Sequence, residues 1–146
     1  MKVVARDGIF LSKRNFLPEF SFLILRFFTG IMMCYFHGWQ KLIGGPERWA
    51  KLGNWLSEAI GLPALNIPLG FMAVFAESIG ALFLAFGLLT RPMSFLLAFT
   101  MMIATLKNFT EVGLQKGELS FIFFLLALVV LLRGSGKYSL DQLFFK

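Results

Sequence analysis

One face of an apolar stretch near the N-terminus carries two cationic side chains and a histidine. Arg26 is followed at offsets of eleven and fifteen residues by His37 and Lys41, and Gly30 lies on the same side. On a helix of 3.6 residues per turn, these four positions fall within an arc of roughly 80°. Because an ionisable group at the bilayer centre costs about 2.5 to 3.5 kcal/mol, such groups generally face a bundle interior or a wet cavity. This polar stripe is the first candidate for a functional site.

Two carboxylates in later apolar stretches, Glu77 and Glu118, are candidate partners for this stripe. Counting about 1.5 Å of rise per residue inward from the outer boundary places Arg26 and Glu77 at similar depth on neighbouring antiparallel helices. We expect these two side chains to form a buried, charge-assisted pair. The same counting places Glu118 in the layer of His37 and Lys41, which predicts a second cluster nearer the outer surface.

The chemistry that these clusters offer is polar and acid-base rather than metal-based. The outer cluster has groups that bind a polar head group or relay a proton, since histidine titrates closest to neutrality. Both clusters also have a structural interpretation, the inner pair as a lock on helix register and the outer cluster as an interface anchor. With one His and no HxxH or CxxC pattern, no metal site is expected. The single cysteine, Cys34, excludes an intrachain disulfide or dithiol centre, so no intrinsic cofactor is predicted.

The elements that carry these residues are apolar helices. Of 146 residues, 58% are hydrophobic and only 15% are charged, which is typical of an integral membrane protein. We predict an all-α fold, a four-helix transmembrane bundle with spans at about 17–40, 67–89, 92–106 and 114–132. In the first outer loop, Pro46 suits a helix start and Gly61 a helix stop, which predicts a short interfacial helix over residues 46–60.

The distribution of positive charge indicates the topology. Lys and Arg number eight on the side of the termini and five on the other, so both termini should be cytoplasmic. The chain then divides into a cytoplasmic N-terminal segment, 1–16, a transmembrane domain, 17–133, and a cytoplasmic tail, 134–146. The net charge of +6 comes from residues that flank the spans, so nucleic acid is excluded as a partner and the lipid bilayer is expected as one.

Several short motifs occur in a specific order along the chain: His37-Gly-Trp-Gln-Lys-Leu42, Glu77-Ser-Ile-Gly80 leading to Gly87-Leu-Leu-Thr-Arg91, and Gly134-Ser-Gly-Lys-Tyr-Ser-Leu-Asp141. From about residue 20 to 141 the chain resembles the DoxX family. The resemblance implies a bacterial or archaeal inner-membrane protein with four helices, similar to subunits associated with quinone-linked sulfur oxidation and membrane redox complexes. The polar positions that match are Arg26, His37, Lys41, Glu77 and Glu118. The loop 105–117 lacks the histidine that many members have there, which argues against a two-histidine site.

These observations lead to one preferred function and two alternatives. We expect an accessory or quinone-interacting subunit of a membrane electron-transfer system, in which the two polar clusters orient a quinone head group and a redox partner protein supplies the electrons. At most, the chain is one subunit of a quinone-linked oxidoreductase. The first alternative is a non-catalytic scaffold or regulator whose buried charges serve helix packing, and the second is a small-molecule permeation or binding protein. A homo-oligomer is compatible with each of these.

Overall fold

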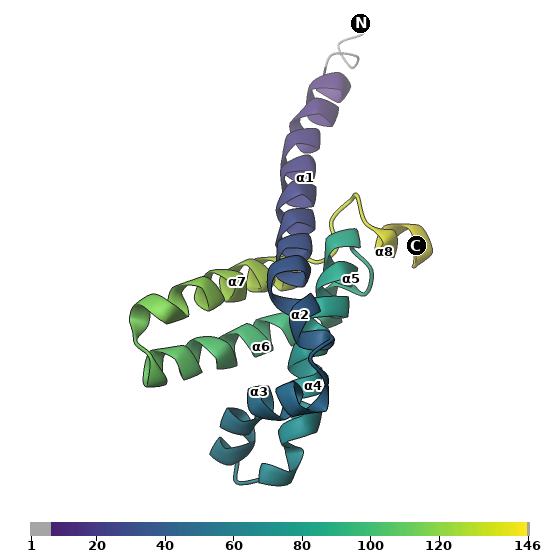
Figure 1. Ribbon diagram of the computed structural model, residues 1–146. Helices are drawn as coiled ribbons and strands as arrows, with labels where there is room; N and C mark the ends of the chain where they lie inside the picture. The colour runs from purple at the N-terminus through teal and green to yellow at the C-terminus, as the bar shows by residue number, and fades with distance from the viewer. Residues whose placement is uncertain (1–6, 146) are drawn as a thin grey trace, which may run out of the picture.

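The computed structural model describes residues 7–145, and within this range the chain forms helices joined by turns and short loops, with no strand (Figure 1). Four helical stretches are long and apolar enough to cross a membrane: Phe16–Leu42, Pro63–Phe86, Thr90–Glu111 and Gln115–Arg133. The predicted all-α fold with four apolar spans is therefore confirmed. The third span extends five residues beyond its predicted end at Leu106, so α6 is long enough without local thinning of the bilayer.

The first two spans are each interrupted by a π-helical turn. The first consists of α1 (Asp7–Met32), the π segment η1 (Met33–Gly38) and α2 (Trp39–Leu42). The second begins with the 3₁₀ turn η2 (Pro63–Leu65) and continues as α4 (Asn66–Phe75), the π segment η3 (Ala76–Gly80) and α5 (Ala81–Phe86). The remaining helices are α3 (Gly45–Ala59), α6 (Thr90–Glu111), α7 (Leu114–Arg133) and α8 (Leu140–Phe144).

Small residues set the register between the first two spans. A Cβ added to Gly30 would lie 2.3 Å from the carbonyl oxygen of Ala81, and one added to Gly38 would lie 2.1 Å from that of Glu77. The two backbones are therefore in direct contact at both positions, as is common where small residues meet in membrane helices. This antiparallel pairing places Gly38 level with Glu77, which decides the geometry of the site below.

The helix predicted over residues 46–60 is present as α3, with Pro46 in its first turn. It packs lengthwise against α4, and the closest point is between Gly53 and Gly70, where an added Cβ on either glycine would meet backbone atoms of the other helix. The ring of Trp49 contacts that of Phe71, with centroids 5.0 Å apart. α3 and α4 therefore form a helical hairpin. In this hairpin the second span continues past the level of Leu42, where the first span ends.

The third and fourth spans pack on each other as a second hairpin, which runs across the direction of α1 in Figure 1. One buried core joins the first span and α5 to this hairpin. Met33, Leu84, Leu97 and Ala127, one from each span, have no solvent-exposed surface.

The segment after α7 folds back onto the ends of the spans. The Asp141 carboxylate accepts hydrogen bonds from the backbone N–H groups of Leu89 (2.7 Å) and Thr90 (2.9 Å), and its own N–H donates to the carbonyl of Gly87. Glu19 accepts from Arg133 (2.9 Å) and from the backbone of the same segment. Much of the predicted tail 134–146 is therefore docked. At the other end, α1 already begins at Asp7, inside the predicted segment 1–16, whose first six residues lie outside the described range.

Candidate functional site

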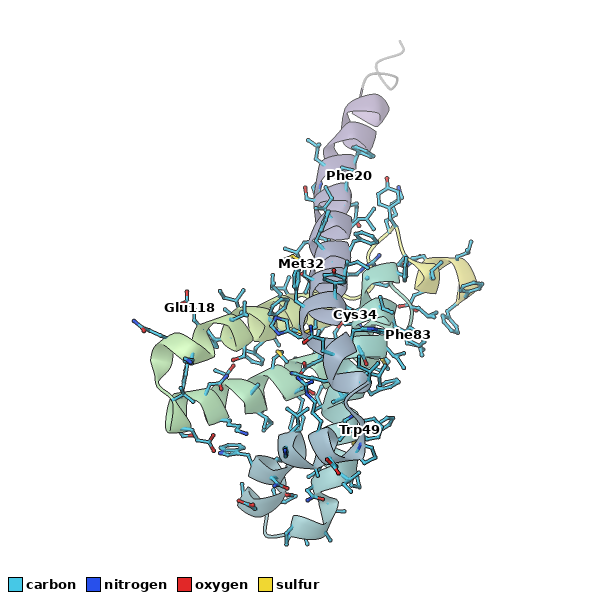
Figure 2. All side chains as sticks on the ribbon, viewed as in Figure 1. Phe20, Met32, Cys34, Trp49, Phe83 and Glu118 are labelled. Atoms are coloured by element: carbon cyan, nitrogen blue, oxygen red, sulfur yellow. The ribbon has the colours of Figure 1, made fainter. Side chains whose placement is uncertain are left out.

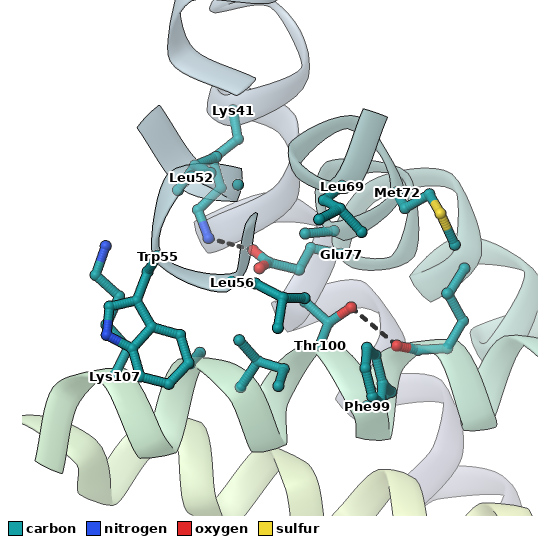
Figure 3. A pocket seen from close by; sticks show the side chains of 15 residues that line it. Lys41, Leu52, Trp55, Leu56, Leu69, Met72, Glu77, Phe99, Thr100 and Lys107 are labelled. Carbon is teal, nitrogen blue, oxygen red and sulfur yellow. Dashed lines mark hydrogen bonds and ion pairs between the residues drawn. The ribbon is translucent and has the colours of Figure 1, made fainter. Parts of the chain in front are cut away.

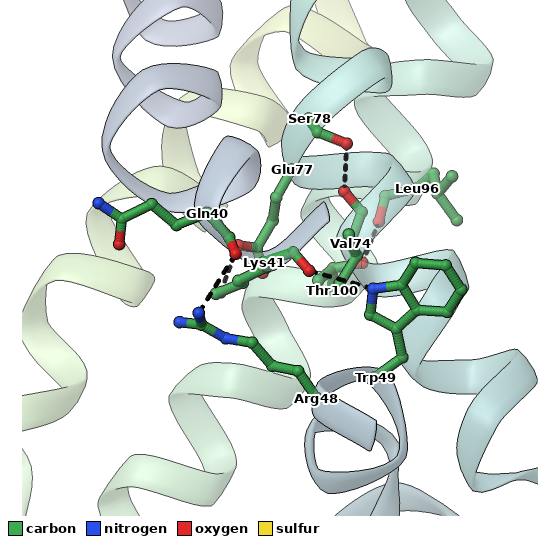
Figure 4. A network of polar contacts seen from close by, with 9 residues as sticks. All are labelled: Gln40, Lys41, Arg48, Trp49, Val74, Glu77, Ser78, Leu96 and Thr100. Carbon is green, nitrogen blue, oxygen red and sulfur yellow. Dashed lines mark hydrogen bonds and ion pairs between the residues drawn. The ribbon is translucent and has the colours of Figure 1, made fainter. Parts of the chain in front are cut away.

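An ion pair between Lys41 and Glu77 joins the first two spans (Figure 4). The ammonium of Lys41 donates to Oε2 of Glu77. Glu77 is 3% exposed, whereas 23% of the Lys41 side chain is accessible. The carboxylate is therefore buried, and its cation lies at the edge of an accessible space.

One member of the pair lies in a π-helical turn, and the other lies just beyond a second π-helical turn. Glu77 belongs to η3, and Lys41 follows η1 by three residues. The two π segments contact each other, and Gly38 allows the approach because it has no side chain. A π turn adds one residue to a helical turn and so rotates the side chains that follow, and such turns occur frequently at functional sites. The pair thus forms next to the point where the two π segments meet.

Polar contacts from neighbouring residues hold the backbone around the pair. The indole Nε1 of Trp49 donates to the carbonyl oxygen of Lys41 (3.0 Å), and Arg48 donates to that of Gln40 (3.2 Å). The hydroxyl of Ser78 donates to the carbonyl of Val74 (2.6 Å). These bonds, seen in Figure 4, satisfy backbone groups at the end of α2 and beside η3. The bonds from Trp49 and Arg48 tie α3 to the backbone of α2.

An apolar cavity of about 130 Å³ lies on one side of the pair, between α3, α4 and α6 (Figure 3). Lys41, Glu77, Thr100 and Lys107 supply its polar groups. Most of its wall is hydrophobic: Leu52, Trp55, Leu56, Leu69, Met72, Ala73, Leu96, Phe99, Ile103 and Ala104. We refer to it as the apolar cavity.

A second cavity of about 240 Å³ lies on the other side of the pair, between the first span, α6 and α7. His37, Asn108, Lys116 and Ser120 line it together with Lys41, Glu77 and several apolar residues. We refer to it as the polar cavity. The imidazole of His37 packs edge-on against Phe123, with ring centroids 5.7 Å apart. Since Lys41 and Glu77 border both cavities, the ion pair is part of the wall between them.

The predicted pairing of Arg26 with Glu77 is wrong. Arg26 is 1% exposed and donates to the backbone carbonyls of Ser135 and Tyr138, the latter at 2.8 Å. The prediction took Pro68 as level with the outer end of the first span. In the structure Gly38 is level with Glu77, and the residue close to Arg26 is Gly87, at the far end of the second span.

Of the predicted outer cluster, His37 and Lys41 share the polar cavity, but Glu118 is exposed and lines neither cavity. Figure 2 shows Glu118 on the part of α7 near the α6–α7 loop. The physical reason is helical phase. Lys116 and Ser120 are four residues apart and face the cavity, whereas a residue midway between them points to the opposite side of the helix. The predicted cluster of three is therefore not formed.

Three polar residues of the site were missed from sequence: Asn108, Lys116 and Ser120. The four-residue spacing of Lys116 and Ser120 on a predicted helix was a usable signal, but it did not show which face is inward. No signal marked Asn108. Among the residues that the structure describes, no group of three His, Cys, Asp or Glu side chains is arranged to hold a metal ion.

Two of the motifs that are far apart in sequence meet in space beside the guanidinium of Arg26. The Gly87–Arg91 turn binds Asp141, and the Gly134–Asp141 segment accepts both hydrogen bonds from Arg26. Comparison with curated proteins gave no match, and comparison with solved structures gave none. The DoxX family profile matches residues 21–132, which include most of all four candidate spans and the Lys41–Glu77 pair. This multi-pass membrane protein therefore belongs to the DoxX family.

Proposed function

We propose that this protein is an accessory, quinone-interacting component of an electron-transfer system in the inner membrane, with both termini cytoplasmic. The quinone head group would occupy the apolar cavity. The observation that carries the proposal is a hydrophobic cavity between α3 and two of the spans that is bordered by an ion pair whose carboxylate is buried. Ligand sites of this kind combine mostly apolar walls with a few placed polar groups.

The chemistry of a quinone fits both the apolar wall of this cavity and the ion pair that borders it. Its ring is planar and apolar, and its carbonyl oxygens accept hydrogen bonds. The Lys41 ammonium has three donors, of which one is used by Glu77, so it can donate to a ring carbonyl. A carboxylate such as that of Glu77 can accept from a quinol hydroxyl.

The route for a hydrophobic tail is lateral. Met72 of α4 and Phe99 of α6 both line the apolar cavity and are exposed on the surface of the protein. In the membrane this surface faces lipid, so a tail attached to the ring would leave between these two helices. The chain has one cysteine and one histidine, and we infer that a partner protein supplies the electrons.

The test is binding of a short-chain ubiquinone by the purified protein in nanodiscs of phosphatidylethanolamine and phosphatidylglycerol, measured by isothermal titration with empty nanodiscs as reference. Ala73→Leu adds bulk to the apolar cavity and should weaken binding at least about tenfold. Glu118→Leu, on the exposed side of α7, is the matched control and should bind as the wild type does. Absence of binding, or equal affinity in all three proteins, would refute the proposal.

A scaffold role is the second candidate, because the docked C-terminal segment forms an ordered surface that exposes Arg91, Arg133 and Lys137. Such a surface suits a soluble partner with an acidic face. Co-purification from mild detergent separates the two functions. A stoichiometric soluble protein without quinone would favour the scaffold.

A further inference from the structure

The two cavities differ in chemistry, although they share a wall. The apolar cavity has hydrophobic sides, while the polar cavity collects a histidine, an asparagine, a serine and a second lysine around the same ion pair. The wall itself is narrow, since Lys41, Glu77 and Ala104 border both spaces. A group bound in one cavity is therefore one side chain away from the other.

Glu77 at this wall and His37 in the polar cavity both retain free hydrogen-bonding capacity. Lys41 occupies Oε2 of Glu77, and within residues 7–145 no hydrogen bond is formed to Oε1. In the same range neither ring nitrogen of His37 has a protein hydrogen-bond partner, and the ring lies in the polar cavity. The other charged groups facing this region are Lys116 in the polar cavity and Lys107 in the apolar one. A free acceptor of Glu77 thus lies at the wall shared by both cavities, and the unpaired His37 ring lies in the polar cavity.

We propose that the polar cavity is the proton-exchange route for a quinol bound in the apolar cavity, with Glu77 carrying protons across the wall and His37 passing them to water in the polar cavity. The inference rests on the proposed function, and it adds a proton path that quinone binding alone does not require. In the oxidising direction, two quinol O–H bonds break, and two protons pass one at a time to Glu77 and onward. Two electrons go to an external one-electron acceptor, which is used twice. In the reverse direction the quinone takes up two electrons and two protons.

The ion pair suits this role because the two members act on different atoms. The Glu77 carboxylate takes the proton, while the Lys41 ammonium stabilises the quinol oxygen that becomes negative as the proton leaves. In the membrane the opening of the apolar cavity between α4 and α6 faces lipid, so protons need a route through the protein. The position of the only histidine of the chain in the polar cavity provides the next acceptor.

The experiment measures proton-coupled oxidation separately from binding. Protein in nanodiscs of phosphatidylethanolamine and phosphatidylglycerol is loaded with a short-chain ubiquinol and mixed with ferricyanide in a stopped-flow spectrometer, in H₂O and in D₂O, with empty nanodiscs subtracted. Ser120→Leu adds bulk to the polar cavity without touching the apolar one, and His37→Gln removes the acceptor. Glu118→Leu places the same leucine side chain outside both cavities and is the control.

We expect Ser120→Leu and His37→Gln to bind ubiquinone with unchanged affinity but to oxidise ubiquinol roughly 10- to 100-fold more slowly, with a larger solvent isotope effect. Imidazole added to His37→Gln should restore part of the rate, which a purely structural role would not produce. Wild-type rates and isotope effects in both variants, with binding intact, would overturn the proton route while the quinone site stands. Absence of ubiquinone binding in the wild type would refute both proposals.

Discussion

Gly38 lies directly against the backbone of Glu77, and a single methyl group at this position would come within 2.1 Å of the Glu77 carbonyl oxygen. The contact fixes the register of the first two spans at the level of the Lys41–Glu77 pair. It also brings the two π segments together. The shape of the site therefore depends on a residue that contributes no functional group.

Gly38→Ala should destabilise the protein by about 1 to 3 kcal/mol or more, because the backbone it would meet cannot move aside as a flexible side chain could. The measurement is thermal unfolding in detergent followed by circular dichroism. Gly80→Ala is the matched control, since its Cβ would lie 3.3 Å from the nearest backbone oxygen. Equal melting temperatures for the two variants would show that the close contact does not set stability.

Glu77→Gln and Lys41→Gln should each cost up to about 3 kcal/mol, with Glu77→Gln nearer that value, because Lys41 keeps partial access to solvent while Glu77 is buried. The double variant should cost much less than the sum. The measurement is the free energy of unfolding, by reversible denaturation, of the wild type, the two single variants and the double variant. In a second double-mutant cycle, on Arg26 and Glu77, the losses of stability should add, because Arg26 binds backbone carbonyls elsewhere. Coupling between Arg26 and Glu77, with none between Lys41 and Glu77, would contradict the observed pairing.

Arg26→Gln should release the segment after α7, because the carbonyls of Ser135 and Tyr138 lose their donor. Limited trypsin digestion in detergent should then cut after Lys137 much faster than in the wild type. Arg133→Gln is the comparison, since the exposed pair with Glu19 contributes no more than about 1 kcal/mol. Digestion of Arg26→Gln at the wild-type rate would show that the guanidinium does not hold the segment.

The predicted topology places the C-terminus in the cytoplasm and α3 on the outer side. Single cysteines at Gln142 and at Glu58, in a Cys34→Ser background, should respond oppositely to an impermeant maleimide added to intact cells. We expect labelling at Glu58 and none at Gln142 until the membrane is permeabilised. The reverse pattern would place the docked C-terminal segment outside.

Hydropathy predicted the four spans well because burial in lipid imposes a length and a composition on each helix. It did not predict register, because register depends on which small residues meet. The depth count began at Pro68, but the second span begins at Pro63 and extends alongside α3, so Glu77 lies opposite Gly38 rather than Arg26. No composition signal marks the two π segments, of which η1 precedes Lys41 and η3 contains Glu77.

The docking of the C-terminal segment has a consequence for biogenesis. Arg26 enters the membrane early in synthesis, but Ser135 and Tyr138, which accept its hydrogen bonds, are made only after all four spans. Until then an unpaired guanidinium lies within the first span, at a cost of about 2.5 to 3.5 kcal/mol. The finished fold therefore depends on residues translated after the fourth span, and a chain interrupted after Arg133 would keep an unpaired guanidinium in the first span that membrane proteases and insertion factors can recognise.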